Sequence, residues 1–248
     1  MIDIFQLYLS NKVEKPSVMN LSVDGNKATI SLQGIVYPEV GINAMDLRNE
    51  IEKAGDVETI VFNINTPGGS VFEGREVMDV IRNTKAKTIA HIGSLCASAG
   101  TSIALACDEV EMANGAHFMI HNAHGIGAGD KSDLRKTADF LEKVELSIIE
   151  DYTSKTGKSS EEIAAMMEEE TWMTASEALK NGFIDRVSSG KQGASNAWNL
   201  ALYKNAPKAQ EPEIKTPENK LPEPVEEKPT GISATQHNTN ALNLALSL

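Results

Sequence analysis

Short apolar runs alternate with amphipathic stretches along the first 190 residues of the chain, and this alternation restricts the folds available to it. The apolar run Thr59–Ile64 ends at the turn signal Pro67-Gly68-Gly69, and a helical pattern follows over Val71–Arg82. Repeats of strand and helix favour parallel strands joined by right-handed helical crossovers. We therefore predict an α/β domain.

The same patterns place the other elements of this domain. Strands are expected at Ala28–Leu32, Lys87–Ile92, Glu109–Met112 and His117–Ile120, and helices at Ala44–Lys53, Ser98–Ala106 and Lys131–Tyr152. A further helix is expected after Gly157, where the sequence Ser-Ser-Glu-Glu contains a capping box. The long helix carries an apolar stripe, which predicts contact with another copy of the chain: Leu134, Leu141, Val144 and Ile148.

Composition changes near residue 190. Six of the nine prolines fall between Pro207 and Pro229, where they are mixed with Glu and Lys. Such a segment buries too little apolar surface to offset its ordering entropy, so we predict that residues 191–248 are mostly disordered. The apolar last residues, ALNLALSL, are interpreted as a frayed end, with a short docking peptide as the alternative.

Charge and hydropathy exclude several classes of protein. A formal net charge of −12 argues against nucleic acid as a partner, because phosphate contacts need clustered Lys and Arg. Apolar runs are too short for a membrane span, and the first residues lack the pattern of a signal peptide, so we expect a cytoplasmic protein. Cys96 and Cys107 lie in apolar surroundings and are expected to be buried, inert thiols.

Ser98 is the candidate nucleophile. In the stretch GSLCASAGTSIALA it stands where a predicted strand feeds a predicted helix. The free N–H groups of a first helical turn favour developing negative charge there. The flanking residues are small, which leaves room for a substrate carbonyl. The alternative is a serine that only caps the helix.

A serine nucleophile needs a base, and His121 is the first choice because it follows an apolar run at a predicted strand end. His124 is the reserve, and a lysine base or a purely structural histidine are the alternatives. The spacing of the two histidines could suit a metal, but the pattern offers no third ligand nearby. We therefore predict neither a metal nor an organic cofactor.

Gly68 and Gly69 form a tight backbone turn whose N–H groups are unhindered and could converge on an oxyanion. The alternative is a turn that only needs positive φ. A nucleotide phosphate loop is disfavoured because no Gly-Lys-Ser/Thr follows.

Four motifs occur in order, NINTPGGSV, GSLCASAG, MIHNAHG and ETWMTASEALKNGFID, and together this series resembles the ClpP serine protease family (peptidase S14). In particular it resembles the head-maturation (prohead) proteases of tailed phages and prophages. The resemblance implies the ClpP/crotonase-like fold, in which β-β-α units repeat and a handle helix protrudes. It divides the chain into an N-terminal segment (1–26), a protease domain (27–190) and the tail (191–248).

The resemblance also implies roles for individual residues. The family's serine falls on Ser98, its histidine on His121, and its oxyanion-hole donors on the backbone N–H groups of Gly69 and Ala99. The third member of the triad is an aspartate in the family, and Glu170 stands in that place here. A glutamate can orient an imidazole, although its extra methylene changes the geometry.

The acidic position has two alternatives. Glu168, Glu169 and Glu170 are consecutive, so a one-residue shift would make a neighbour the third member. The three could also be the solvated acidic end of a helix.

The predicted function is that of a serine endopeptidase with a Ser-His-acid triad, which processes phage capsid or scaffold proteins during head maturation. The alternatives are a non-catalytic oligomeric capsid assembly factor, a general ATP-dependent Clp-type degradation peptidase, and acyl-CoA chemistry on the same fold. The chain order Ser, His, acid argues against an α/β-hydrolase. The resemblance implies a homo-oligomeric ring, protein substrates, and an AAA+ unfoldase as a further partner.

Overall fold

The computed structural model describes residues 18–38, 40–188, 198–200 and 203–207. Its strands are β1 (Val18–Asp24), β2 (Lys27–Gln33), β3 (Thr59–Thr66), β4 (Lys87–Ala97), β5 (Glu109–Ala113), β6 (His117–Ile120), β7 (Thr171–Thr174) and β8 (Arg186–Ser188). Its helices are α2 (Ala44–Ala54), α3 (Val71–Arg82), α4 (Ala99–Leu105), α5 (Lys131–Thr156), α6 (Ser160–Glu168) and α7 (Ala175–Lys180).

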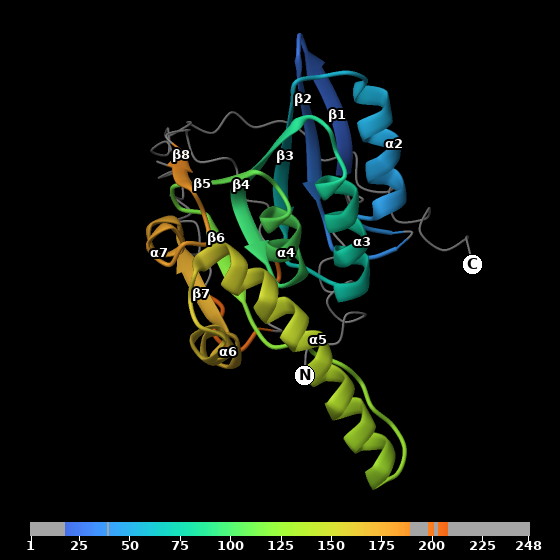
Figure 1. Cartoon of the computed structure of the whole chain (residues 1–248), viewed down its shortest axis with the longest axis vertical. Helices are drawn as coiled ribbons and strands as arrows, with labels where there is room; N and C mark the ends of the chain where they lie inside the picture. Colours follow the sequence, from blue (N-terminus) through green and yellow to red (C-terminus); the bar gives the residue numbers. More distant parts are fainter. Residues whose placement is uncertain (1–17, 39, 189–197, 201–202, 208–248) are drawn as a thin grey trace, which may run out of the picture. The chain divides into compact units, whose positions relative to one another are not determined.

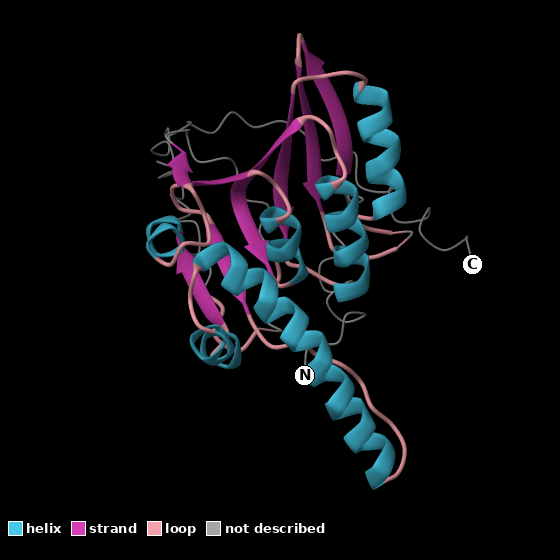
Figure 2. Cartoon of the chain, viewed as in Figure 1, coloured by secondary structure: helices cyan, strands magenta, loops and turns pink. Residues whose placement is uncertain are grey.

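The strands form one mixed sheet, in the order β1-β2-β3-β4-β5-β8, and β6 pairs with both β4 and β7. Pairing is parallel from β2 to β8 and between β4 and β6, and antiparallel where β1 meets β2 and β7 meets β6. Figure 1 and Figure 2 show α2, α3 and α4 side by side against the sheet. The predicted α/β fold is confirmed.

Strand β4 is longer than the sequence predicts. The strand was expected to end before Gly93, yet it continues to Ala97. The reason is a change of partner, because Ile89–Ile92 pair with β5 and Leu95–Ala97 pair with β6. The sequence pattern predicts an end before Gly93 because a glycine within a run of strand-forming residues often marks a break or a bulge.

The long helix α5 begins at a capping box formed by Asp130 and Asp133 and ends at Gly157, whose φ of 71° suits a left-handed C-cap. Its last turns pack on the core through Ile148, Ile149 and Tyr152. Its first part extends away from the sheet, as the yellow-green helix of Figure 1 shows. The predicted handle helix is therefore present.

The ends of the predicted protease domain need separate description. Strand β1 precedes residue 27 and pairs along its whole length with β2. In the predicted tail, residues 198–200 and 203–207 are described, and they belong to the same compact unit as the sheet. The rest of the predicted tail, with His237 and ALNLALSL, lies outside the described residues.

Gly100 offers a test of how tightly α4 packs on the sheet. A Cβ at this position would lie 2.2 Å from Cγ2 of Thr66 on β3. We expect Gly100→Ala to lower the free energy of unfolding by about 1–3 kcal/mol, since overpacking outweighs the better helix propensity of alanine. Urea denaturation measures this loss.

Two variants serve as controls for Gly100→Ala. Adding Thr66→Ser should recover part of the loss, because serine lacks Cγ2 but keeps the hydroxyl that accepts a bond from Gly68 N at 3.0 Å. Gly93→Ala should be nearly neutral, because a Cβ there meets nothing within 4 Å. Equal stabilities of the Gly93 and Gly100 variants would contradict the packing argument.

Candidate active site

Ser98 occupies the junction between β4 and α4 with φ 54° and ψ −128°, a conformation that L-residues rarely adopt. Its hydroxyl makes no capping bond to α4, so it is free for other contacts. The turn at Gly68 makes this geometry possible, since a Cβ on Gly68 would lie 2.6 Å from Cβ of Ser98. Such strain at a turn between a strand and a helix is typical of a nucleophilic serine.

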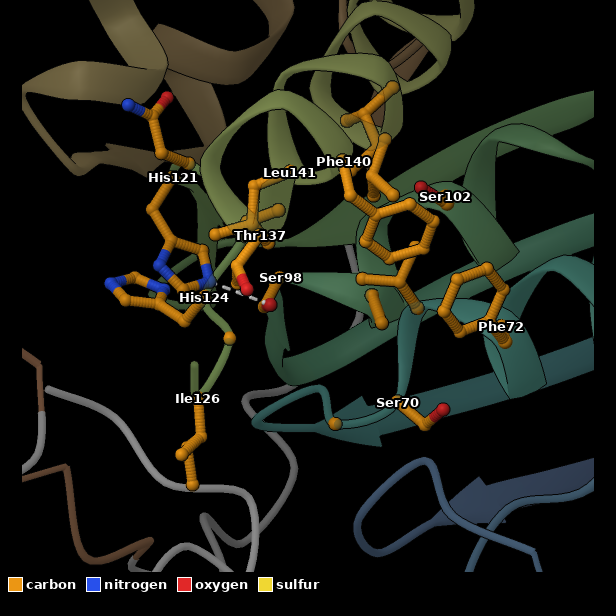
Figure 3. Close-up of a pocket in the computed structure, with 18 of the residues that line it drawn as sticks. Ser70, Phe72, Ser98, Ser102, His121, His124, Ile126, Thr137, Phe140 and Leu141 are labelled. Carbon is orange, nitrogen blue, oxygen red and sulfur yellow. Dashed lines mark hydrogen bonds between the residues drawn. The ribbon is translucent and has the colours of Figure 1, made fainter. Parts of the chain in front are cut away.

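His121 lies opposite Ser98 because of the register between β4 and β6. Ala97 pairs with Met119, and Ser98 N donates to Met119 O at 2.9 Å. The chain leaving β6 then carries His121 to the serine, where Nε2 lies 2.7 Å from Ser98 Oγ (Figure 3). With its proton on Nδ1, the imidazole accepts the serine hydroxyl proton at Nε2.

The His121 ring is held away from water. Its pKa is lowered to about 4, chiefly by burial and also by the nearby His124, while the charge of Glu170 acts to raise it. The centroid of the His124 ring lies 4.7 Å from that of His121. The Tyr203 ring stands edge-on to His121, with its centroid 5.7 Å away. A neutral imidazole at pH 7 is the form that a general base requires.

The predicted oxyanion donors lie next to the serine. Ala99 is the first residue of α4, and Gly69 has φ 152° on the turn after β3. Both residues line the same cavity as Ser98. Among the described residues, neither N–H has a hydrogen-bond partner, so both remain available as donors.

Glu170 is buried, whereas Glu168 and Glu169 are exposed. The interpretation of a solvated acidic end therefore does not describe Glu170. Its φ of 52° is a second strained position in the site. Its charge reaches His121, but its carboxylate does not hydrogen-bond the ring, and His121 Nδ1 is buried with no partner in the described part of the chain.

The Glu170 carboxylate is instead bound by three N–H groups. Trp172 Nε1 and Asn205 N donate to Oε1 at 3.0 and 2.7 Å, and Lys204 N donates to Oε2 at 2.9 Å. Two of these donors come from the segment that the sequence assigned to a disordered tail. The aromatic residues Trp198 and Tyr203, which precede the proline-rich and acidic part of the tail, were the available signal for its packing.

A cavity of about 410 Å³ adjoins the serine and the histidine. Figure 3 shows Phe72 and Phe140 on its wall, and their rings stack with centroids 6.1 Å apart. Leu141 and Val144 of α5 continue the apolar surface, and none of the described lining residues is Asp, Glu, Lys or Arg. The cavity suits a peptide segment with apolar side chains.

The two cysteines lie apart from this chemistry. Both are buried, and burial raises the pKa of each thiol above its usual range, as we predicted for inert thiols. Within residues 18–188 and the short described segments beyond, no group of three His, Cys, Asp or Glu side chains is arranged to hold a metal ion. No helix of that part is long and apolar enough to cross a membrane.

Known proteins share this sequence and fold. The family described as Clp protease matches residues 27–191. The chain is 33% identical over 132 residues to ATP-dependent Clp protease proteolytic subunit 1 of Protochlamydia amoebophila, which covers 52% of this chain and 64% of that protein. It is 31% identical over 141 residues to the proteolytic subunit of Streptococcus pneumoniae, with coverages of 55% and 72%.

A solved structure agrees with the sequence match. A ClpP1 mutant from Listeria monocytogenes superimposes with a TM-score of 0.59 at 22% identity, over 66% of this chain and 92% of that one. The fold and the serine–histidine pair define a serine peptidase of the ClpP type. Since the family match covers more than half of its length, the chain belongs to the Clp protease family. The narrower resemblance to prohead proteases stays a prediction.

The low pKa of His121 predicts the pH dependence of peptidase activity. Below this pKa the ring is protonated and cannot accept the Ser98 proton, so kcat/KM should fall on acidification with a midpoint near pH 4. A free imidazole would place that midpoint at about 6.5. Initial rates with a fluorogenic peptide measure the profile, and circular dichroism checks that the protein stays folded. A midpoint at or above that of free imidazole would contradict the burial of His121.

Proposed function

We propose that the chain is a cytoplasmic serine endopeptidase in which Ser98 is the nucleophile and His121 the general base. The observation that carries the proposal is the 2.7 Å contact between Ser98 Oγ and His121 Nε2, made by a serine with strained backbone. A serine that only caps a helix would direct its hydroxyl to the helix N–H groups, and this one does not. A non-catalytic assembly factor would have no need of such a contact.

In the proposed acylation step, His121 Nε2 accepts the proton as Ser98 Oγ bonds to the substrate carbonyl carbon. The carbonyl oxygen becomes negative and is bound by the N–H groups of Gly69 and Ala99. Loss of one such donor typically costs about 100-fold to 1,000-fold in kcat. The imidazolium then gives its proton to the leaving amine nitrogen, and the peptide C–N bond breaks.

Deacylation follows by the same groups. Water gives a proton to His121 Nε2 and its oxygen bonds to the acyl carbon, which again places negative charge between Gly69 and Ala99. The ester bond to Ser98 Oγ breaks, and the proton returns to that oxygen. Glu170 is the proposed acid that stabilises the imidazolium in both steps, since its charge already raises the pKa of His121.

The similar proteins favour degradation over head maturation as the biological role. The relatives found are proteolytic subunits of ATP-dependent Clp proteases, and we propose that this chain likewise works with an AAA+ unfoldase. Processing of capsid or scaffold proteins is the second candidate, and it is supported by the sequences and the order of the four motifs. Acyl-CoA chemistry on this fold would not use the Ser98–His121 pair.

Ser98→Ala tests the activity itself. The purified variant should lose peptide cleavage and labelling by a fluorophosphonate probe, because the attacking oxygen is gone. Its melting temperature should stay close to that of the unmodified protein, since the hydroxyl makes no capping bond. Ser102→Ala is the control, because Ser102 lines the same cavity without contacting His121. Retained cleavage by Ser98→Ala would refute the assignment.

Assays with protein substrates distinguish the two biological roles, degradation and head maturation. Degradation predicts that a folded, tagged protein is destroyed only when an AAA+ unfoldase and ATP are present. Head maturation predicts limited cleavage of a capsid or scaffold protein without ATP. Labelling of Ser98 in either case would exclude a purely structural role.

We further propose that the chain forms a ring in which α5 contributes to contact between copies. Of the predicted apolar stripe only Leu134 is exposed, because Ile148 is buried in the core and Leu141 and Val144 line the cavity. Two other large apolar side chains of this helix, Phe140 and Leu146, are also exposed. Surfaces of this kind are typical of interfaces.

Replacing Leu134 and Leu146 together by Asp should convert the ring to smaller species in sedimentation velocity, because the interface would then bury unpaired charge. Lys143→Ala on the same helix is the control and should leave the sedimentation coefficient unchanged. A monomeric unmodified protein with full activity at micromolar concentration would contradict the proposal.

A further inference from the structure

A short segment beyond the family domain packs against the candidate active site. We name residues 198–200 and 203–207 the C-terminal strap. The family match ends at residue 191, so the strap is a feature of this chain outside the matched region. The strap packs through apolar side chains. Trp198, Leu200 and Tyr203 join a cluster that includes Leu95 and Met119.

Tyr203 anchors the strap between parts of the site. Its ring is buried, and its hydroxyl donates to the carbonyl of Pro67, directly before the glycine turn that carries Gly69. The ring stands edge-on to both His121 and Trp172, with centroid distances of 5.7 and 5.6 Å. The strap therefore contacts the oxyanion turn and the histidine at one point.

Trp198 provides a second anchor at the other end of the strap. Its Nε1 donates to Oδ1 of Asn65 near the end of β3 at 2.7 Å. The side chain of Asn205 donates to the carbonyl of Glu169 at 2.6 Å. These bonds fix the backbone on both sides of Lys204.

The anchored backbone then binds Glu170. Lys204 N and Asn205 N donate to its two carboxylate oxygens, and Trp172 Nε1 adds a third bond. A carboxylate has about four acceptor sites, so one site, on Oε2, is left over. The buried group nearby that lacks a partner within the described residues is His121 Nδ1.

We propose that the C-terminal strap is a positioning element of the catalytic site, in which the backbone N–H groups of Lys204 and Asn205 hold the Glu170 carboxylate close enough for its charge to act on His121. The inference rests on the proposed function and extends it. The strap acts through Glu170 and touches no reacting atom. Fixed N–H donors keep the carboxylate in place beside the imidazolium, so loss of the donors at Lys204 and Asn205 should lower kcat and leave KM nearly unchanged.

The test removes the donors from the full-length chain one at a time. Lys204→Pro deletes one backbone N–H, and Trp172→Phe deletes the side-chain donor without touching the backbone. Each should lower kcat by about tenfold to a hundredfold with KM nearly unchanged, the fold-change expected for one hydrogen bond to a charged group. Lys204→Ala keeps the N–H, and its exposed side chain contributes little, so it should lose far less than Lys204→Pro.

A double-mutant cycle separates positioning from general structural damage. In a Glu170→Gln background, Lys204→Pro and Trp172→Phe should cause no further loss of kcat, because the group through which they act is already neutral. Tyr203→Phe, which loses only the bond to Pro67, provides a second strap variant should the proline variant unfold. Melting temperatures show which variants are folded.

Each outcome decides the inference. Losses of kcat that vanish in the Glu170→Gln background support it. Losses that add to that of Glu170→Gln show a structural role and overturn it, and so does a rise in kcat, which would mean that the strap withholds Glu170 from His121. A fully active Glu170→Gln variant refutes the assignment of the acid, whereas loss of activity in Glu170→Gln with unaffected strap variants refutes only the strap.

Discussion

The backbone at Ser98 is the constraint on which the rest of the site depends. A serine with φ 54° between β4 and α4 requires a neighbour that leaves it room, and the glycine at position 68 supplies that room. Gly68 lies against Ser98 Cβ, and Gly100 lies against Thr66. The strain directs the hydroxyl away from the helix and toward His121. It also leaves the N–H of Ala99 free at the first turn of α4, so one local distortion shapes both the proposed nucleophile and one proposed oxyanion donor.

The change of partner along β4 brings the histidine to that serine. The first half of β4 pairs with β5, and its last residues pair with β6. This branching creates a separate parallel pair whose carboxyl ends carry Ser98 and His121 at the same level. The β6 strand also pairs with β7, which follows Glu170 directly. Ser98 and His121 therefore come into contact through the pairing of β4 with β6, and the pairing of β6 with β7 places Glu170 near enough for its charge to act on His121.

Desolvation governs the electrostatics of the pair. Burial and His124 lower the pKa of His121, and the charge of Glu170 opposes both effects. The acid is itself held by N–H donors from β7 and from the C-terminal strap. Apolar side chains from α3 and α5 form much of the wall of the same cavity. The site thus combines a neutral base, a nearby buried carboxylate and unpartnered backbone donors, which is the combination that acyl transfer requires.

The sequence by itself determined the α/β class, the bounds of α3 and β6, and the candidate pair Ser98 and His121, because periodicity and turn signals are local properties. Strand β1 was not predicted. The strands β7 and β8 were missed because they are too short for a period to appear, and β4 was predicted to end before Gly93 because its second partner is remote in sequence. Only the tertiary structure decided which of the three consecutive glutamates is buried, that His121 and not His124 contacts the serine, and that residues near 204 bind Glu170. Each of these depends on contacts between segments that no local pattern connects. The charged and proline-rich composition after residue 207 obscured the packing of Trp198 and Tyr203, whose hydrogen-bond partners lie more than a hundred residues away.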